Sequence, residues 1–153
     1  MKYWLLKSEP GTFGIEHLLA ARRRRTRWDG VRNYQVRNML RDEMRVGDLA
    51  FFYHSSCAVP GIYGIVKIVA AGRPDPTAFD RRDAHYDPKS DPAAPTWYSV
   101  EIELVKRLAE PITLEKMQAS ARALGELLIL RRGNRLSITP VTAAQWRKVL
   151  ALA

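Results

Sequence analysis

The chain has 153 residues, 46% of them hydrophobic and 27% charged, which suits one folded domain and excludes a disordered tail or a collagen-like fibre. Its 25 Lys and Arg residues outweigh 16 Asp and Glu residues, and the formal net charge of +9 favours a polyanionic partner. Its single cysteine, Cys57, excludes an internal disulfide framework. The apolar runs are too short for a membrane span or a secretory signal, so we expect no membrane partner and a cytoplasmic location, nuclear if eukaryotic.

The first third of the chain alternates between signals for strands and signals for helices. The apolar run at 2–7 meets a Pro-Gly turn, which predicts a strand, and a short helix-like face follows over 15–19. The arginine-rich segment 22–27 is too charged for a core and is expected to be exposed. Asn33 is predicted to cap a helix that ends near residue 45, because apolar residues then recur three and four positions apart.

The rest of the chain predicts four more strands. We expect them at 49–54, 61–71, 97–104 and 136–139, and the glycines of the second indicate bends or close backbone approach. Residues 73–95 hold five prolines and five aspartates, which is typical of a loop built from turns. Helices are expected at 114–119, at 121–128 and after the capping box of Thr142 and Gln145. Together these elements predict an α+β fold, most like a curved mixed β-barrel of about five to six strands with flanking helices.

The positive charge is concentrated in two lobes. Residues 22–45 carry nine arginines and no lysine against three acidic residues, and residues 106–153 are also strongly basic. Arginine suits phosphate because its planar guanidinium donates hydrogen bonds in a fork. A solvated surface or a localisation signal would also explain the run at 22–25. We expect phosphate contacts from Arg22, Arg23, Arg24, Arg25, Arg32 and Arg131.

No motif in the chain requires an enzyme. It lacks a phosphate-binding glycine loop, a nucleophile elbow and a zinc-binding cysteine pair. His54 and Cys57 lie three residues apart, but no third group orients them, so a structural cysteine is favoured over a catalytic pair. We expect no catalysis, no cofactor and no metal. The alternative is a small nucleotide- or RNA-processing enzyme that uses Cys57, His54 or Glu9.

Four segments combine aromatic, hydrogen-bonding and cationic groups: 4–10, 28–34, 51–56 and 131–137. A nucleobase pocket needs flat rings for stacking, amides or hydroxyls for the base edge, and cations for the phosphates. Phe51 and Phe52 are more typical of a core, whereas Trp28 follows the exposed arginines and is a candidate stacking surface. The four segments form one pocket only if the fold brings them together.

Five sequence motifs carry a family resemblance. They are KYWLLKSEP, WDGVRNYQVRN, MRVGDLAFFYHS, PDPTAFD with YDPKS and Trp97-Tyr98, and LLILRRGNRLSITPVT. Together they resemble the EVE domain family over the whole chain, as a single domain of residues 1–153. The resemblance implies a PUA-like fold, related to YTH and ASCH domains. It also implies a non-catalytic module, expected to be a monomer, that reads a modified cytosine or adenine in DNA or RNA. A generic RNA-binding domain without base selectivity is the remaining alternative.

The resemblance also implies roles for individual residues. Trp28 would be a stacking wall, with Tyr34 or Tyr98 as a second aromatic face, and the Val31 backbone would contact the base at the rim. The Arg22–Arg25 run departs from the family pattern, so its role rests on charge. Further residues would line or close the pocket: Lys7, Ser8, Asn33, His54, Ser55, Arg132, Asn134, Arg135 and Ser137.

Overall fold

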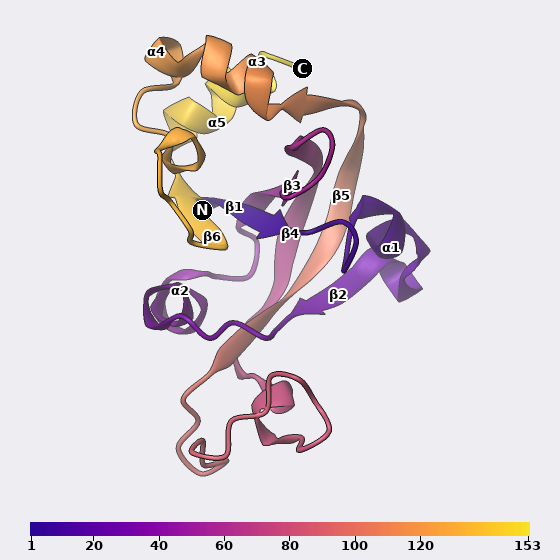
Figure 1. The fold of residues 1–153 in the computed structure, drawn as a ribbon, viewed down its shortest axis with the longest axis vertical. Coiled ribbons are helices and arrows are strands. Elements are labelled where there is room, and N and C mark those ends of the chain that lie inside the picture. The colour runs from indigo at the N-terminus through magenta and orange to yellow at the C-terminus, as the bar shows by residue number, and fades with distance from the viewer.

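The computed structural model describes residues 1–153 and is built around one six-stranded sheet (Figure 1). The strands are β1 (Tyr3–Ser8), β2 (Arg25–Trp28), β3 (Leu49–His54), β4 (Gly61–Pro74), β5 (Tyr98–Thr113) and β6 (Ile138–Val141). Their order is β2-β5-β4-β3-β1-β6, and only the β1–β3 pair is parallel. The predicted α+β class is therefore confirmed. The sheet curves, but β2 and β6 remain its two edges, so the predicted barrel does not close.

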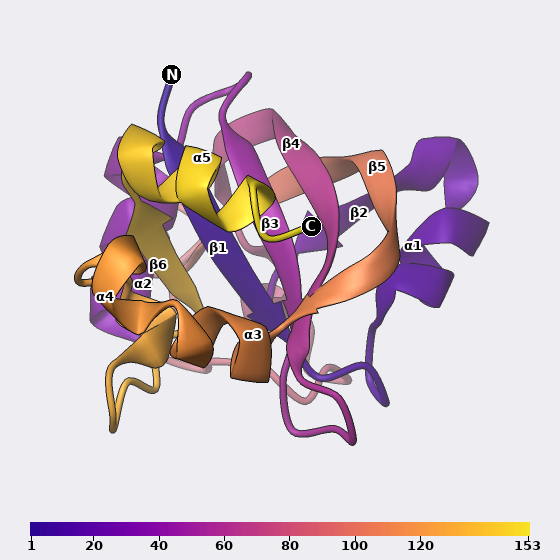
Figure 2. The same ribbon diagram turned by 90° about the horizontal axis from the view of Figure 1, so that it is seen from above.

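Five short α-helices surround the sheet. They are α1 (Ile15–Ala20), α2 (Tyr34–Asn38), α3 (Leu114–Ala119), α4 (Ala121–Leu124) and α5 (Ala143–Leu150). The last three gather at one end of the molecule, and the loop between β4 and β5 projects from the opposite end (Figure 1). Seen from above, α5 lies over β1 and β3 (Figure 2). None of these helices has the length and apolar character needed to cross a bilayer.

The central strands are buried on both faces. Successive residues of a strand point to opposite faces, so Trp4 and Leu6 join one core cluster while Leu5 joins the other. On β3, Phe52 and Phe51 divide in the same way. Helices α1 and α2 cover the first cluster, and α3, α4 and α5 cover the second. The continuous apolar runs that predicted these strands follow from burial on both sides.

The long strands β4 and β5 bend the sheet. Their pairing shifts register at several places between Ile62 and Arg73, and such bulges increase local twist. Glycine permits the strands to approach closely. A Cβ atom at Gly61 would lie 2.5 Å from the carbonyl oxygen of Ile112, and one at Gly64 would lie 3.0 Å from that of Lys106. The close backbone approach predicted from these glycines is confirmed.

The helix caps follow the sequence prediction. The Asn33 Oδ1 accepts a hydrogen bond from the Val36 N–H at 3.0 Å at the start of α2, which continues as a π-helical turn to Glu43. Thr142 and Gln145 form the predicted capping box of α5, with hydrogen bonds of 3.1 and 2.9 Å. The aspartates of the 73–95 loop also behave as predicted, because each accepts from the backbone N–H two residues on.

Strand β2 was not predicted. Residues Arg25–Trp28 pair antiparallel with β5 at the edge of the sheet, and the first three of them lie in the segment 22–27 that we expected only to be exposed. Arg25 is half-buried against Glu103, with Nε and Oε2 2.7 Å apart, whereas Arg27 is exposed. Charged residues suit an edge strand because they discourage further strand pairing. The exposure was therefore predicted correctly in part, but the strand was missed because its pattern is polar.

A buried carboxylate joins β1 to the turn before β3. Asp48 is 2% exposed and accepts hydrogen bonds from three donors: the Lys2 N–H, the Trp4 Nε1–H and the Arg45 N–H, each at 3.0 Å. A buried donor without a partner is strongly unfavourable. Asp48 therefore satisfies the indole of Trp4, one of three buried core tryptophans, and fixes the start of the first strand.

Replacing Asp48 with alanine is expected to destabilise the fold by about 2–4 kcal/mol, because it leaves three donors without an acceptor. Urea denaturation followed by circular dichroism measures the change. Asp42→Ala is the matched control, since Asp42 is exposed and pairs only with the adjacent Arg41. Equal unfolding midpoints for the two variants would contradict the role given to Asp48.

Candidate nucleic-acid interface

A hollow of about 360 Å³ opens between two aromatic rings. Phe13 and Trp28 both pack edge-on against Phe52, with ring centroids 6.4 and 6.3 Å from it at angles of 70° and 89°. Phe52 is fully buried, so it is the core residue against which the two outer rings pack. The hollow is lined by Ser8, Thr12, Phe13, Thr26, Arg27, Trp28, Asp29 and His85.

The curvature of the sheet creates this arrangement. Trp28 lies on β2 and Phe52 on β3, and the two strands are separated in the sheet by β5 and β4. Contact between their rings requires the sheet to curl until its edge strand stands over its centre. Phe13 reaches the same place from the turn between β1 and α1, so three separate parts of the chain meet at the hollow.

An arginine-rich groove of about 670 Å³ lies beside the hollow. The two share Thr26 and Arg27 of β2, so they are neighbours on the surface. The groove is strongly basic, with Glu101 as its only acidic side chain. Its arginines are Arg22, Arg23, Arg25, Arg27 and Arg73. Predicted phosphate contacts at Arg22, Arg23 and Arg25 thus come together; Arg24 is exposed beside them but does not line the groove.

The turn that presents these arginines has an unusual backbone. Arg23 and Arg24 have φ angles of +57° and +53°, in the left-handed region that non-glycine residues seldom occupy. Such residues cost of the order of 1 kcal/mol each and cluster at functional sites. The strained turn holds three consecutive exposed guanidinium groups beside β2.

Predicted pocket residues at the end of β1, just after β3 and just before β6 lie close together. The Lys7 N–H donates to the Ser137 carbonyl at 2.8 Å, and the Ser55 N–H donates to the Ser8 carbonyl at 2.8 Å. The Ser8 hydroxyl donates to the Phe13 carbonyl at 2.5 Å, which ties the strand end to the hollow. The loop before Ser137 carries the exposed cations Arg131, Arg132 and Arg135. The loop that carries these cations is therefore joined through Ser137 and Lys7 to the strand end that lines the hollow.

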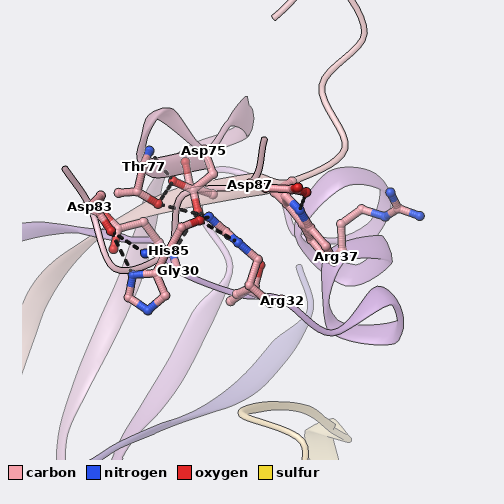
Figure 3. A network of polar contacts seen from close by, with 12 residues as sticks. Gly30, Arg32, Arg37, Asp75, Thr77, Asp83, His85 and Asp87 are labelled. Atoms are coloured by element: carbon pink, nitrogen blue, oxygen red, sulfur yellow. Dashed lines mark hydrogen bonds and ion pairs between the residues drawn. The ribbon is translucent and has the colours of Figure 1, made fainter. Parts of the chain in front are cut away.

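A buried ion pair holds the 75–87 loop against the segment after β2 (Figure 3). Asp75 is fully buried; one oxygen accepts from the Gly30 N–H at 2.8 Å and from Arg32 Nη1 at 3.0 Å. Its other oxygen accepts from the N–H and the hydroxyl of Thr77 at 2.9 and 2.7 Å. Burial alone would raise the pKa of Asp75, but the hydrogen bonds from Thr77, Arg32 and Gly30 outweigh it and hold this pKa below its ordinary value.

Arg32 does not fit its predicted phosphate role. Its guanidinium donates to Asp75, to the hydroxyl of Thr77 and to the carbonyls of Val31 and His85, which uses all five N–H groups. The group also lies 5.3 Å from the ring centre of Trp97. Arg32 is a structural clamp between two segments and has no donor left for a phosphate.

Three predicted pocket side chains serve the fold instead. Asn33 is the N-cap of α2. Asn134 donates to the Leu128 carbonyl at 2.9 Å and accepts from the Leu136 N–H at 3.1 Å, which shapes its own loop. His54 is buried, and its Nε2 accepts from the Ile15 N–H at 3.0 Å at the start of α1. Burial lowers the pKa of His54, and this nitrogen is not available as a base for Cys57.

The second aromatic wall differs from the predicted one. Tyr34 is 61% exposed and packs on Trp97, with ring centres 4.9 Å apart, away from the residues of the hollow. Tyr98 lies near Arg41 and does not line the hollow either. Phe13 lines the hollow together with Trp28 in their place. Val31 is buried, and its N–H donates to no group of the chain, so the predicted backbone contact there stays a prediction.

Sequence reasoning missed several residues of the surface: Thr12, Phe13, Thr26, Arg27, Asp29, Arg73 and His85. Thr26, Arg27 and Asp29 flank Trp28 in the chain and were within reach of a strand prediction. Phe13, Arg73 and His85 arrive through loops and long-range packing, which no local pattern signals.

A model of the EVE domain family matches residues 2–152. The chain belongs to the EVE domain family. Thymocyte nuclear protein 1 of Danio rerio is 43% identical over 97% of this chain and 71% of its own length. The Homo sapiens protein is 42% identical over 98% of this chain and 73% of its own length. The family predicted from the sequence motifs is confirmed; the cytoplasmic location stays a prediction.

Solved structures of EVE relatives share the fold over nearly the whole chain. An X-ray structure of a Pseudomonas putida protein has a TM-score of 0.91 and 45% identity, with 98% of each chain covered. A crystal structure of human THYN1 protein in complex with 5-methylcytosine-containing DNA has a TM-score of 0.89 and 41% identity, with 99% of this chain and 97% of that chain covered. The curved, open sheet of this EVE protein is thus the THYN1 fold.

The Asp75 clamp predicts a loss of stability in acid. The pKa of Asp75 in the folded protein lies below the ordinary value of about 3.9. The ionised carboxylate therefore contributes to the free energy of unfolding above about pH 3.9, and this contribution is lost as the pH falls through the folded pKa. Asp75→Asn, which cannot titrate, is expected to be less stable at pH 7 and to lose less stability between about pH 5 and pH 3. Urea unfolding at a series of pH values measures both curves. The titration of His54 is common to both proteins and cancels in the difference, so parallel curves would contradict the role of Asp75.

Proposed function

We propose that this EVE protein is a non-catalytic reader of DNA that carries a modified cytosine. The whole chain acts as one domain, and the modified base is everted into the hollow between Phe13 and Trp28. The observation that carries the proposal is that this aromatic hollow opens beside the arginine groove, with Thr26 and Arg27 common to both. The crystal structure of human THYN1 with 5-methylcytosine-containing DNA supports the choice of ligand.

The hollow and the groove suit different parts of the ligand: the hollow suits the base, and the groove suits the phosphates. Phe13 and Trp28, each packed against Phe52, give the hollow two aromatic rings, and stacking contributes about 1–3 kcal/mol per base. Everting a paired base costs a few kcal/mol, so stacking alone leaves little net affinity. Phosphate contacts must supply the remainder, and we assign them to the exposed guanidinium groups of Arg22 and Arg23, which line the groove.

On the other side of the hollow, the nucleic-acid backbone would meet the basic 131–137 loop. Ser8 lines the hollow, and its neighbour Lys7 is hydrogen-bonded to Ser137, which ends the loop that carries Arg132 and Arg135. Everted-base recognition leaves nucleic-acid backbone both before and after the base. The groove arginines and the 131–137 loop would hold these two flanks, and the hollow would read the base between them.

Trp28→Ala is expected to reduce selectivity for the modification. Binding of two otherwise identical oligonucleotides, with one central 5-methylcytosine or cytosine, is measured by fluorescence anisotropy at fixed salt. The wild-type affinity ratio should fall toward one in Trp28→Ala and in Phe13→Ala, because each removes one wall of the slot. Tyr34→Ala removes an exposed ring outside the hollow and is expected to keep the ratio. An unchanged ratio in Trp28→Ala would sink the proposal.

The groove predicts a different signature, which depends on salt and not on the base. Removing Arg22 and Arg23 together is expected to weaken binding of both oligonucleotides equally. The slope of log K against log salt should become shallower by about 0.9 for each phosphate that is no longer neutralised. The control replaces Arg147 and Lys148 with alanine, which removes the same charge from α5 on the opposite core. If both double variants reduce the slope alike, the groove is not the phosphate site. Equal binding of RNA without base preference would favour the generic RNA-binding alternative.

A further inference from the structure

Two polar side chains of the hollow lie outside every role given so far. His85 reaches the hollow from the loop between β4 and β5, and Asp29 follows directly after β2. Both are partly exposed, with 49% and 30% of the side chain accessible. They border the slot formed by Phe13 and Trp28, so they can meet the edge of a base that stacks there.

The structure fixes which nitrogen of His85 is free. Nδ1 lies 3.1 Å from Asp83 Oδ1, and an ionised carboxylate can only accept, so Nδ1 carries the ring proton. In the neutral ring, Nε2 is then a hydrogen-bond acceptor without a partner in the chain. Figure 3 shows the ring turned away from Asp75, with one nitrogen joined to Asp83 and the other unbonded.

Several contacts hold His85 in this position. Its N–H donates to Asp83 Oδ1 at 2.8 Å, and its carbonyl accepts from the Arg32 guanidinium. The ring lies against Gly30, where a Cβ atom would come within 2.8 Å of it, and Gly30 also has a φ of +75°. A side chain at position 30 would therefore displace the imidazole. The acceptor is held by contacts to the His85 backbone, which a substitution of its side chain leaves in place.

Asp29 adds a second acceptor. One carboxylate oxygen accepts from Arg27 Nε at 3.0 Å, and the other has no partner in the chain. Aspartate commonly accepts a hydrogen bond from the exocyclic amino group of cytosine. An acceptor repels the carbonyl oxygen that thymine carries at the same position. His85 and Asp29 therefore favour an amino group over a keto group at the base edge.

We propose that His85 and Asp29 are specificity-determining residues that make the hollow select an amino-bearing pyrimidine, 5-methylcytosine, over its keto counterpart, thymine. This inference rests on the proposed function. The two bases share the 5-methyl group and the stacking area, so the aromatic walls alone cannot separate them. The acceptors supply the distinction, and the Asp75–Arg32 clamp positions one of them.

The test compares duplexes with one central 5-methylcytosine or thymine, each placed opposite an abasic site so that base pairing does not differ. Wild-type protein is expected to bind the 5-methylcytosine duplex about tenfold more tightly than the thymine duplex. His85→Phe keeps a flat ring but removes the acceptor, and Asp29→Ala removes both carboxylate oxygens. Each is expected to lower the ratio about fivefold. His85→Gln restores an acceptor and should keep most of the ratio.

Asp42→Ala is the matched control for the loss of one exposed carboxylate. A wild-type ratio near one, or the wild-type ratio in both His85→Phe and Asp29→Ala, would overturn the inference. Loss of all binding by folded variants would overturn it too, because that outcome marks a general contact. The proposed function is tested separately by the ratio of 5-methylcytosine to cytosine and its dependence on Trp28.

Discussion

The contact between Trp28 and Phe52 is the constraint on which the candidate site depends. These residues lie on strands separated by two others, and their rings meet only because β4 and β5 curl the sheet. The curl requires glycine at Gly61, where a Cβ atom would lie 2.5 Å from the Ile112 carbonyl oxygen, and the backbone is also close at Gly64. Opening of the sheet at its β2 edge would separate Trp28 from Phe13 and remove the hollow. The same edge carries the groove arginines, so stacking surface and charge share one structural support.

In the proposed function, phosphate binding and base recognition are assigned to separate surfaces. The groove beside β2 and the 131–137 loop carry mainly positively charged side chains, whereas the hollow is lined by aromatic rings and few charged groups. Asp75 and Arg32 take no part in either surface, yet they fix the loop that brings His85 to the hollow. A neutral, buried His54 likewise supports α1 and the Phe13 turn through the Ile15 N–H. Several of the most polar buried residues are thus part of the scaffold that positions an aromatic site.

The sequence predicted elements well where one local pattern decided them. Strand β3 was predicted with the bounds that the structure has, and the Asn33 cap and the Thr142–Gln145 capping box were found because their signals span only a few residues. Strand β2 was missed because an edge strand with alternating arginines resembles a solvated run. The motifs also identified the family and placed Trp28 and Ser8 in one region. They could not exclude Arg32, because most of its partners lie between 43 and 53 residues further along the chain.

Which aromatic residues line the hollow could not be predicted from local sequence either, because they come together through contacts between distant parts of the chain. Tyr34 shares a family motif with Trp28, and Tyr98 stands in another, but Trp97 and Arg41 engage these rings, and Phe13 takes their place through tertiary packing. Base eversion is tested most directly by comparing the affinity for 5-methylcytosine opposite guanine with that for 5-methylcytosine opposite an abasic site. An everted base must first lose its pairing, so wild-type protein is predicted to bind the unpaired site more tightly, and Trp28→Ala should lose most of that gain. Equal affinity of wild-type protein for the paired and unpaired sites would contradict base eversion into the hollow.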